Sequence, residues 1–507
     1  MAAVAADGRF IGLDVGTSGV KGVLIDGAGA VLARHTVGYP ILTPRPGWTE
    51  QEPETWWRAA CDVLRELGTA AAGVGVDAVG LAGQMHGAVF LDRDGAVIRP
   101  APLWNDQRTA AECAEIERRV GAARLRRITG NPALTGFQAP KILWLRDSEP
   151  EAYRRVRHVL LPKDYVRYRL TGALATDASD AAGTLLLDLR ARDWSAEVLG
   201  ALEVPRDWLP RVYEGPEVTG PVSAEGAAAT GLAAGVPVVA GGGDNAAAAV
   251  GSGVVRDGTG LVSLGTSGVV FVHTDEARID PSGALHAFCH AVPGRYHLMA
   301  VMLSAGGSLR WFRDAVVPEL AARAAAEGRD VYDGLTAGAA EVAPGADGLF
   351  FLPYLAGERT PHMDPDVRGG WLGLGLNHDR RHMVRALLEG VAFGLRDGLE
   401  LIRALEAPPE RLFAVGGGTA GPLWRAILAA ALDVPLQRLA AEEGPAFGAA
   451  LLASVGAGAH PDVGAAVAAA VRPRGPVEPP DPELRAVYAR LYPRFRALYP
   501  AVKASGG

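Results

Sequence analysis

Short apolar runs flank two copies of one turn sequence in this chain of 507 residues. The pentapeptide Gly-Thr-Ser-Gly-Val occurs at 16–20 and again at 265–269, which is 249 positions later (265 − 16) and close to half the length. An apolar run precedes each copy, at 10–13 and 260–264, and another follows it. Apolar run, glycine-rich turn and apolar run predict a β-hairpin. An identical repeat at half the length favours a duplicated domain over chance recurrence.

The remaining pattern alternates between strand-like and helix-like segments. Apolar positions three and four apart predict helices, and short apolar runs between turn residues predict strands. The predicted helices are 56–67, 382–397, 423–432 and, after a proline-rich stretch from Pro473, 483–498. The predicted strands beyond the hairpins are 78–82, 89–91, 236–240 and 411–415. Strands that alternate with helices predict α/β domains whose sheets are covered on both faces.

Composition supports two ordinary globular domains. Hydrophobic residues make up 49% and charged residues 21%, enough for two sizeable cores of about 250 residues each. The formal net charge of −7 provides no basic field, so we expect no nucleic-acid partner.

Cysteine usage and the terminus bear on location. Cys61, Cys113 and Cys289 are odd in number and widely spaced, which indicates a reducing compartment. Residues 1–9 lack a signal-peptide pattern, and His460-Pro461-Asp462 interrupts the alanine-rich stretch 448–471. We therefore expect a cytoplasmic protein that does not enter a membrane.

The two predicted hairpin tips are candidate phosphate-binding sites. Glycine lets a ligand approach the backbone, and N–H groups with the hydroxyls of Thr17 and Ser18 can converge on phosphate oxygens. One tip in each half suggests a polyphosphate held from both sides. The four lysines (Lys21, Lys141, Lys163 and Lys503) lie in no Gly-x-x-x-x-Gly-Lys-Ser/Thr context, so a Walker-type loop is absent.

Asp14 stands just before the first tip, where the second copy has Ser263. A carboxylate beside phosphates is repelled unless a cation lies between them, and Mg²⁺ takes carboxylate and phosphate oxygens. The alternative is an aspartate that caps its own turn.

Asp244 follows a predicted strand and the glycines 241–243, and it precedes a helix-favouring run. Aspartate is a good helix N-cap. A cap alone does not need three glycines, which clear space for a ligand, so we also expect Asp244 to be a general base for an acceptor hydroxyl. The two roles are compatible.

Three further loops are weaker candidates. Gly416-Gly417-Gly418 joins a strand to a helix, where a nucleotide can lie against backbone. Gln84-Met85-His86 and Trp104-Asn105-Asp106 combine flat or apolar surfaces with polar groups, which suits a polyhydroxylated ligand. Core packing is the alternative for Met85 and Trp104. For 286–290, which contains His286 and His290, we favour packing over zinc.

Long segments of the chain resemble the FGGY carbohydrate kinases of the actin, sugar-kinase and Hsp70 ATPase superfamily. The segment 137–144 is similar to the N-terminal signature of the family, and 369–374 with 382–389 is similar to the C-terminal one. The resemblance extends from Ile11 to about Ala453. The stretches at 83–87, 103–106, 161–165, 179–184, 241–246 and 357–362 are most similar to members that act on D-xylulose.

The resemblance implies two ribonuclease-H-like, actin-like α/β domains with a deep cleft between them. We expect domains at 8–246 and 255–455 and a helical tail at 473–507. A homodimer is one alternative for the oligomeric state. By resemblance, ATP and Mg²⁺ bind in the cleft. The implied residues are Asp244 as catalytic base; Gln84, Met85, His86, Trp104 and Asp106 for the sugar; Asp14 for the metal; and Thr17, Ser18, Gly265, Thr266, Gly416, Gly417 and Gly418 for ATP.

The implied reaction is ATP-dependent phosphorylation of D-xylulose to D-xylulose 5-phosphate in pentose catabolism. One alternative is a kinase for another ketose, a polyol such as glycerol, or a sugar acid. A second is a non-catalytic, nucleotide-dependent scaffold, because the actin-like fold also serves assembly.

Overall fold

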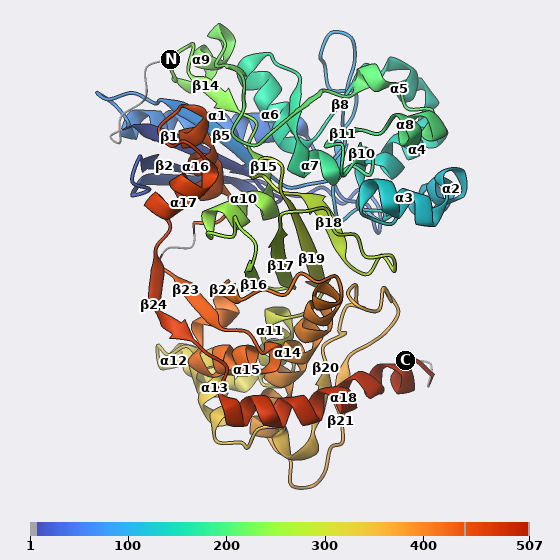
Figure 1. Cartoon of the computed structure of the whole chain (residues 1–507), viewed down its shortest axis with the longest axis vertical. Coiled ribbons are helices and arrows are strands. Elements are labelled where there is room, and N and C mark those ends of the chain that lie inside the picture. The colour runs from blue at the N-terminus through green and yellow to red at the C-terminus, as the bar shows by residue number, and fades with distance from the viewer. Residues whose placement is uncertain (1–7, 441–442, 505–507) are drawn as a thin grey trace.

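The computed structural model describes residues 8–440 and 443–504, so most of the segment inspected for a signal peptide lies outside the described residues. Figure 1 shows two α/β domains stacked along the long axis, each built on one seven-stranded sheet. The predicted two-domain α/β fold is confirmed.

The first sheet contains the first predicted hairpin at its centre. Its strand order is β13 (Val218–Pro221), β14 (Pro237–Val239), β5 (Ala78–Gly83), β1 (Arg9–Val15), β2 (Gly19–Asp26) and β3 (Val31–Gly38), with β15 (Gly242–Gly243) also paired to β5. Strand β1 is antiparallel to β2 and parallel to β5.

The second sheet repeats this arrangement. Its order is β18 (His286–Cys289), β19 (Tyr296–Met302), β17 (Gly268–Thr274), β16 (Thr259–Leu264), β22 (Arg411–Val415), β23 (Leu436–Leu439) and β24 (Pro473–Glu478). Strand β16 is antiparallel to β17 and parallel to β22, as β1 is to β2 and β5. The duplication inferred from the repeated pentapeptide is therefore visible in the topology.

Helices and short ribbons complete the two domains. The first domain has α1 (Pro53–Ala70), α2 (Ala110–Val120), α3 (Ala122–Thr129), α4 (Gln138–Ser148), α5 (Pro150–Arg155), α6 (Pro162–Thr171), α7 (Ala178–Ala182), α8 (Ala196–Leu202), α9 (Ala224–Thr230) and α10 (Asp244–Gly251). The second has α11 (Gly306–Trp311), α12 (Pro318–Ala326), α13 (Val331–Ala340), α14 (Arg380–Ala404), α15 (Pro422–Leu432) and α18 (Pro482–Ala504). Helices α16 (Pro445–Gly456) and α17 (Val463–Ala470) belong to the C-terminal half of the sequence but lie with the first domain. The two-stranded pairs are β4 (Glu50–Gln51) with β7 (Ala101–Pro102), β6 (Val89–Leu91) with β8 (His158–Leu160), β9 (Ala175–Asp177) with β12 (Arg211–Tyr213), β10 (Leu187–Asp188) with β11 (Asp193–Trp194), and β20 (Phe350–Leu352) with β21 (Gly370–Leu372).

Helix α16 lies in sequence between β23 and β24 of the second sheet, but it packs on the first sheet, beside α10 and α17 (Figure 1). A Cβ atom at Gly80 of β5 would lie 2.0 Å from the carbonyl oxygen of Ala449, so only glycine permits this approach. The chain therefore crosses from the second domain back to the first before it ends.

The tail differs in part from the prediction. Residues 473–478 form the edge strand β24 rather than an irregular proline-rich stretch, and α18 extends beyond the predicted limits on both sides. Helix α18 packs against α14 and α15 of the second domain, and the last predicted tail residues, 505–507, lie outside the described part.

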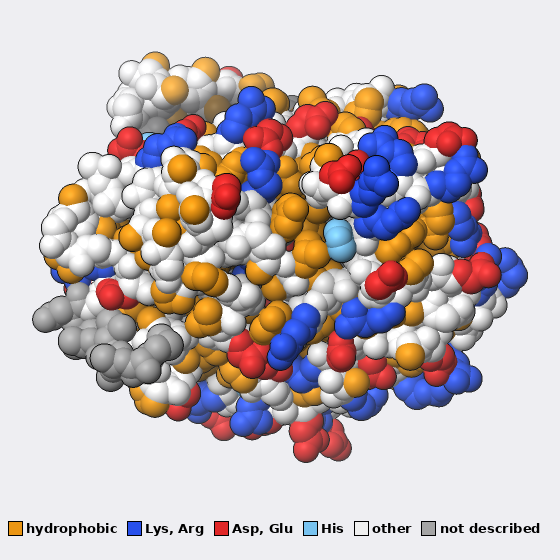
Figure 2. All heavy atoms as spheres, turned by 90° about the horizontal axis from the view of Figure 1, so that it is seen from above, with side chains coloured by type: hydrophobic (Ala, Val, Ile, Leu, Met, Phe, Trp, Pro, Cys, Tyr) orange, Lys and Arg blue, Asp and Glu red, His pale blue; other side chains and the backbone are white. Residues whose placement is uncertain are grey.

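On the face seen in Figure 2, basic and acidic side chains are interspersed with apolar ones, as expected for a net charge of −7 without a basic field. Among the described residues, none of the helices combines the length and apolarity needed to span a bilayer. All three cysteines are free.

Candidate active site

Polar side chains from several elements fix the first hairpin tip, Gly16–Ser18. The hydroxyl of Tyr39 donates to the Gly16 carbonyl oxygen at 2.6 Å, and Gln51 Nε2 donates to that of Thr17 at 2.8 Å. Gln84 Nε2 also donates to Gly16 O, at 3.3 Å. With its carbonyl groups held from behind, the tip is a rigid loop.

Gln84 supports this tip more than it lines a cavity. It is 2% exposed, its Oε1 accepts from Thr17 Oγ1 at 3.2 Å, and its Nε2 donates to Gln51 as well as to Gly16. Trp104 Nε1 donates to the same Thr17 hydroxyl at 3.0 Å. The predicted sugar contact of Gln84 therefore needs correction, because its amide is already bonded to the tip.

Asp14 is the penultimate residue of β1, just before the tip. Its Oδ1 atom is buried and has no hydrogen-bond partner among the described residues. Burial, with a smaller contribution from the nearby Asp244, raises the pKa of Asp14 to about 7 against the opposing effect of Lys21. A buried, unpartnered carboxyl oxygen is costly unless a cation satisfies it, so Asp14 suits a hard metal ion such as Mg²⁺.

Asp244 is the first residue of α10, and Gly243 occupies the N-cap position. The alternative that Asp244 caps the helix is wrong, because its side chain accepts instead from Asn245, from N at 2.6 Å and Nδ2 at 2.8 Å. Burial raises the pKa of Asp244 to about 6, against the effect of these two bonds. A carboxyl with such a pKa can accept a proton near neutrality.

The second hairpin tip and the glycine-rich turn share one cavity of about 370 Å³. Gly265, Thr266, Gly417 and Gly418 line it, together with aromatic and polar side chains that include Tyr332, Trp424 and Arg310. Gly416 lies on the wall of an adjoining cavity of about 230 Å³, with Asn245 and Ser263. The structure thus brings the second set of predicted nucleotide residues together.

A larger cavity of about 510 Å³ has walls from both domains. His86, Trp104 and Asn105 come from the first domain, and Glu358 and Arg359 come from the second. Its aromatic walls with a few polar groups suit a small polyhydroxylated ligand. Met85, beside His86, is 5% exposed.

His86 adopts a left-handed backbone conformation with φ of 70°, which is unusual for a residue other than glycine. Its Nδ1 lies 2.5 Å from the carbonyl oxygen of Gly183. Because a carbonyl only accepts, Nδ1 carries the hydrogen and Nε2 keeps a free lone pair. Burial lowers the pKa of His86 to about 3, so the ring is neutral and Nε2 can accept from a ligand hydroxyl.

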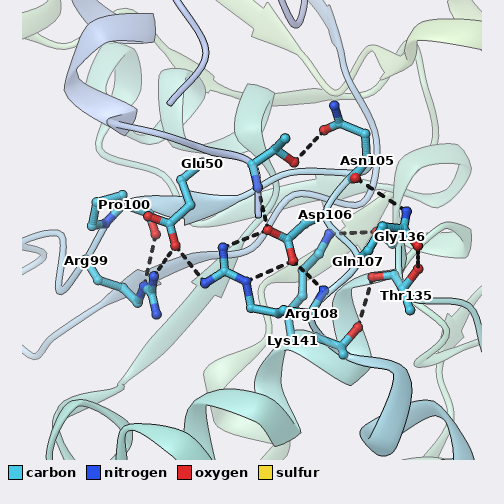
Figure 3. Close-up of polar contacts among 12 residues, drawn as sticks. Glu50, Arg99, Pro100, Asn105, Asp106, Gln107, Arg108, Thr135, Gly136 and Lys141 are labelled. Atoms are coloured by element: carbon cyan, nitrogen blue, oxygen red, sulfur yellow. Dashed lines mark hydrogen bonds and ion pairs between the residues drawn. The ribbon is translucent and has the colours of Figure 1, made fainter. Parts of the chain in front are cut away.

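Asp106 does not line this cavity. Figure 3 shows its carboxylate bonded to Arg108, which also pairs with Glu50 at 2.7 Å. Asp106 has no exposed surface and accepts from the backbone N–H of Thr49 at 2.7 Å. The guanidinium of Arg108 lies 3.7 Å from the ring centroid of Trp48. The prediction of a direct sugar contact by Asp106 is thus not supported; this buried cluster holds the loop that carries Asn105.

Sequence reasoning assigned no role to Lys141, Glu358 or Arg359. Lys141 Nζ donates to the carbonyl oxygens of His86 at 2.8 Å and Gly136 at 2.6 Å, and its burial lowers its pKa to about 7. Burial also raises the pKa of Glu358 to about 8, and its Oε2 has no hydrogen-bond partner in the described structure. The family-like segments 137–144 and 357–362 contained these residues, but the position of Lys141 behind His86 and those of Glu358 and Arg359 on the cavity wall depend on the fold.

The residues 286–290 are buried, and His286 and Phe288 also line the cavity of about 510 Å³. His286 Nδ1 lies 2.8 Å from Asn131 Oδ1, and its ring stacks on Phe288 with centroids 5.7 Å apart.

Known proteins share both sequence and architecture with this chain. The models of the FGGY family of carbohydrate kinases match its N-terminal domain over residues 9–251 and its C-terminal domain over 260–457. A xylulose kinase of Escherichia coli (strain K12) is 44% identical over 497 residues, covering 97% of this chain and 98% of the relative. The crystal structure of xylulose kinase from Rhodospirillum rubrum, 34% identical, superposes with a TM-score of 0.91 and covers 98% of this chain and 99% of that one. The crystal structure of gluconate kinase from Lactobacillus acidophilus, 27% identical, has the same TM-score and covers 98% of each chain. The chain belongs to the FGGY family of carbohydrate kinases.

Proposed function

We propose that this protein transfers the γ-phosphoryl group of ATP to the terminal hydroxyl of D-xylulose and forms D-xylulose 5-phosphate. The full-length likeness to xylulose kinases supports the choice of sugar. The reaction class is supported chiefly by Asp244, a half-buried carboxyl with a pKa of about 6 that is close enough to Asp14 to raise the pKa of Asp14 as well. A cytoplasmic location, where ATP is available and thiols stay reduced, fits this function.

In the proposed reaction, Asp244 takes the proton of the acceptor hydroxyl while that oxygen attacks the γ-phosphorus in line. A base held at hydrogen-bond distance both orients the nucleophile and removes its proton. The two bonds from Asn245 to Asp244 Oδ1 fix the carboxyl and leave Oδ2 for the acceptor.

The phosphates would lie between the two hairpin tips. Thr17 and Ser18 would bind from the first tip, Gly265 and Thr266 from the second, and Gly416–Gly418 would hold the nucleoside side. Backbone N–H groups and hydroxyls provide donors without a phosphate-loop lysine. Mg²⁺ held at Asp14 would supply positive charge to the phosphate oxygens.

The sugar would contact Met85, His86 and Trp104. His86 Nε2 accepts from a sugar hydroxyl, because Gly183 fixes the ring tautomer. Gln84 and Asp106 act indirectly in this scheme, Gln84 through the first tip and Asp106 through the loop of Asn105. Walls from both domains exclude water, which otherwise competes as an acceptor.

A sugar acid is the second candidate acceptor. Arg359 lines the shared cavity, and the structure gives it no ion pair within the described residues. An arginine so placed can bind a carboxylate, and the gluconate kinase of Lactobacillus acidophilus shares the fold.

A panel of acceptors separates these candidates. Initial rates of ADP formation are measured with D-xylulose, D-ribulose, glycerol and gluconate, with an acceptor-free reaction as control. We expect kcat/KM for D-xylulose to exceed the others by at least about 10-fold, a difference of about 1.4 kcal/mol in transition-state binding. A higher kcat/KM for any other acceptor would replace D-xylulose as the substrate.

A further inference from the structure

Five ionisable side chains without solvent exposure form one cluster in the first domain: Lys163, Asp164, Arg167, Asp177 and Asp180. Nζ of Lys163 lies 2.7 Å from Asp164 Oδ1, 2.9 Å from Asp177 Oδ1 and 3.1 Å from Asp180 Oδ2. Removing so many charges from water costs several kcal/mol for each ion, and apolar side chains of similar volume often stabilise a core as well or better. Stability alone is therefore a weak reason for this cluster.

Burial and the opposite charges within the cluster act against each other on the pKa values of its members. Burial raises the pKa of Asp180 well above its ordinary value, against the opposing effect of Lys163. Burial lowers the pKa of Lys163, but the three neighbouring carboxyl groups outweigh it and leave that pKa above its ordinary value.

One arm of the cluster reaches the residue before Asp244. The hydroxyl of Ser179 donates to Asp177 Oδ2 at 2.5 Å, and the backbone N–H of Gly243 donates to Ser179 Oγ at 3.0 Å. Because its hydrogen is committed to Asp177, Ser179 Oγ presents a lone pair to Gly243.

A second arm holds the start of the same segment. Arg167 donates to the carbonyl oxygen of Val239 at 2.6 Å and to that of Ala240 at 2.5 Å. Between the two arms, Gly241 has a φ of 75°, and a Cβ there would lie 1.7 Å from the Leu81 carbonyl oxygen. The turn before Asp244 is thus fixed at both ends and leaves no room for a side chain at Gly241.

The short helix α7, which contains Ser179, also leads to His86. Gly183, the residue after α7, accepts from His86 Nδ1. A Cβ at Gly183 would lie 2.7 Å from Met85 Cε and 2.8 Å from His86 Cε1. One five-residue helix therefore contacts both the turn before Asp244 and the two residues proposed to bind the sugar.

We propose that Ser179 is a positioning residue for phosphoryl transfer. Its hydroxyl, oriented by Asp177 and Lys163, fixes the backbone of Gly243 and thereby the carboxyl of Asp244, an assignment that rests on the proposed role of Asp244 as the base. The segments 161–165 and 179–184 are part of the family resemblance, which implied no role for them. In this proposal they together hold Asp244 at the distance that the acceptor hydroxyl requires.

Steady-state kinetics of Ser179 variants test this role. In Ser179→Ala we expect kcat for D-xylulose to fall about 10- to 100-fold, because a misplacement of about 1 Å can cost up to about 10²-fold. KM for ATP should stay within about twofold, since the nucleotide residues are untouched. Ser179→Thr, which keeps the hydroxyl, should recover kcat to within about threefold of the wild type.

Ser454→Ala is the matched control, because Ser454 is a buried serine whose hydroxyl donates to Leu451 O at 2.7 Å, far from α7 in sequence. Its kcat should equal that of the wild type. A folded Ser179→Ala variant with kcat within about threefold of the wild type would overturn the proposal. So would a fall in kcat of Ser454→Ala as large as that of Ser179→Ala and accompanied by a lower Tm, because general destabilisation would then explain both. If Ser179→Ala is not recovered folded, Ser179→Cys, whose sulfur is a weak acceptor, is judged by the same criterion.

The wild-type acceptor panel is measured first. If D-xylulose is not the preferred acceptor, the same variants are compared with the acceptor that is. The choice of sugar and the role of Ser179 can then fail separately.

Discussion

Burial sets the ionisation of the groups at the candidate site. It raises the pKa of Asp14 to about 7 and that of Asp244 to about 6, and it lowers that of His86 to about 3. At neutral pH these values leave Asp244 mostly ionised and so able to accept a proton. Asp14 is then only partly ionised until a cation binds it, and His86 is neutral. Each residue therefore has the charge state that its proposed role needs.

Asp14→Ala should raise the Mg²⁺ concentration needed for half-maximal activity by about 10-fold or more, because the proposed carboxylate ligand is lost. The measurement is initial rate against Mg²⁺ at fixed ATP. Asp26→Ala is the control, since Asp26 lies at the other end of the β1–β2 hairpin and accepts from Ala28 N and Ala30 N. An unchanged titration in Asp14→Ala would remove Asp14 from the metal site.

Stability should also depend on buried neutral histidines. Burial lowers the pKa of His297 to about 3, and neither ring nitrogen has a hydrogen-bond partner among the described residues. Since the folded pKa lies below the unfolded value near 6.5, the unfolded chain binds more protons on acidification. The contribution of His297 to stability is then full above pH 6.5 and is lost as the pH falls toward 3.

His297→Phe should remove this dependence, because phenylalanine can keep the stack on Phe271, where centroids are 4.1 Å apart. Between pH 7.5 and 5 the wild type should lose about 2 kcal/mol relative to the variant. Denaturant unfolding at both pH values measures the difference, with His35→Phe on β3 as the control. Parallel pH profiles for wild type and His297→Phe would contradict the expectation.

At the scale of elements, the sequence predicted those hairpins and helices whose formation depends on neighbouring residues. Both hairpins were predicted correctly, because apolar runs flank turns whose glycines the geometry requires. Strand β24 was missed since Pro473 and Pro476 argue against a strand, although an edge strand tolerates proline. Helix α18 was predicted too short because it continues beyond residue 498 through Pro500.

The packing of α16 on the first sheet was beyond sequence reasoning, because it joins residues more than 350 positions apart. Gly80→Ala should force α16 off β5 and lower Tm by several degrees, since the added Cβ meets the Ala449 carbonyl oxygen, and overpacking costs about 1–3 kcal/mol. Gly200→Ala in α8, where a Cβ meets nothing within 4 Å, should leave Tm unchanged or higher. Differential scanning calorimetry compares the two, and an unchanged Tm in Gly80→Ala would be inconsistent with this packing.

At the scale of the whole molecule, two copies of one fold have diverged around a shared cleft. The first copy supplies Asp14, Asp244 and His86, and the second supplies Ser263 at the position of Asp14, as well as the nucleotide-sized cavity. The candidate phosphate-binding residues on the hairpin tips and in the glycine-rich turn could be predicted, because glycine leaves the backbone there open to a ligand. The burial of Asp106 could not, because Thr49, whose backbone N–H it binds, and Glu50, which shares Arg108 with it, approach it only in the folded domain.

The proposed reaction depends above all on Asp244, which removes the proton of the D-xylulose hydroxyl that receives the phosphoryl group. The most direct measurement is kcat of Asp244→Asn with D-xylulose and saturating Mg²⁺ and ATP, with binding of both substrates followed by calorimetry. We expect kcat to fall by about 10² or more, because the asparagine amide has the shape of the aspartate carboxylate but cannot accept the proton. Both dissociation constants should stay within a few fold of the wild type. A folded Asp244→Asn variant with kcat near that of the wild type would contradict it.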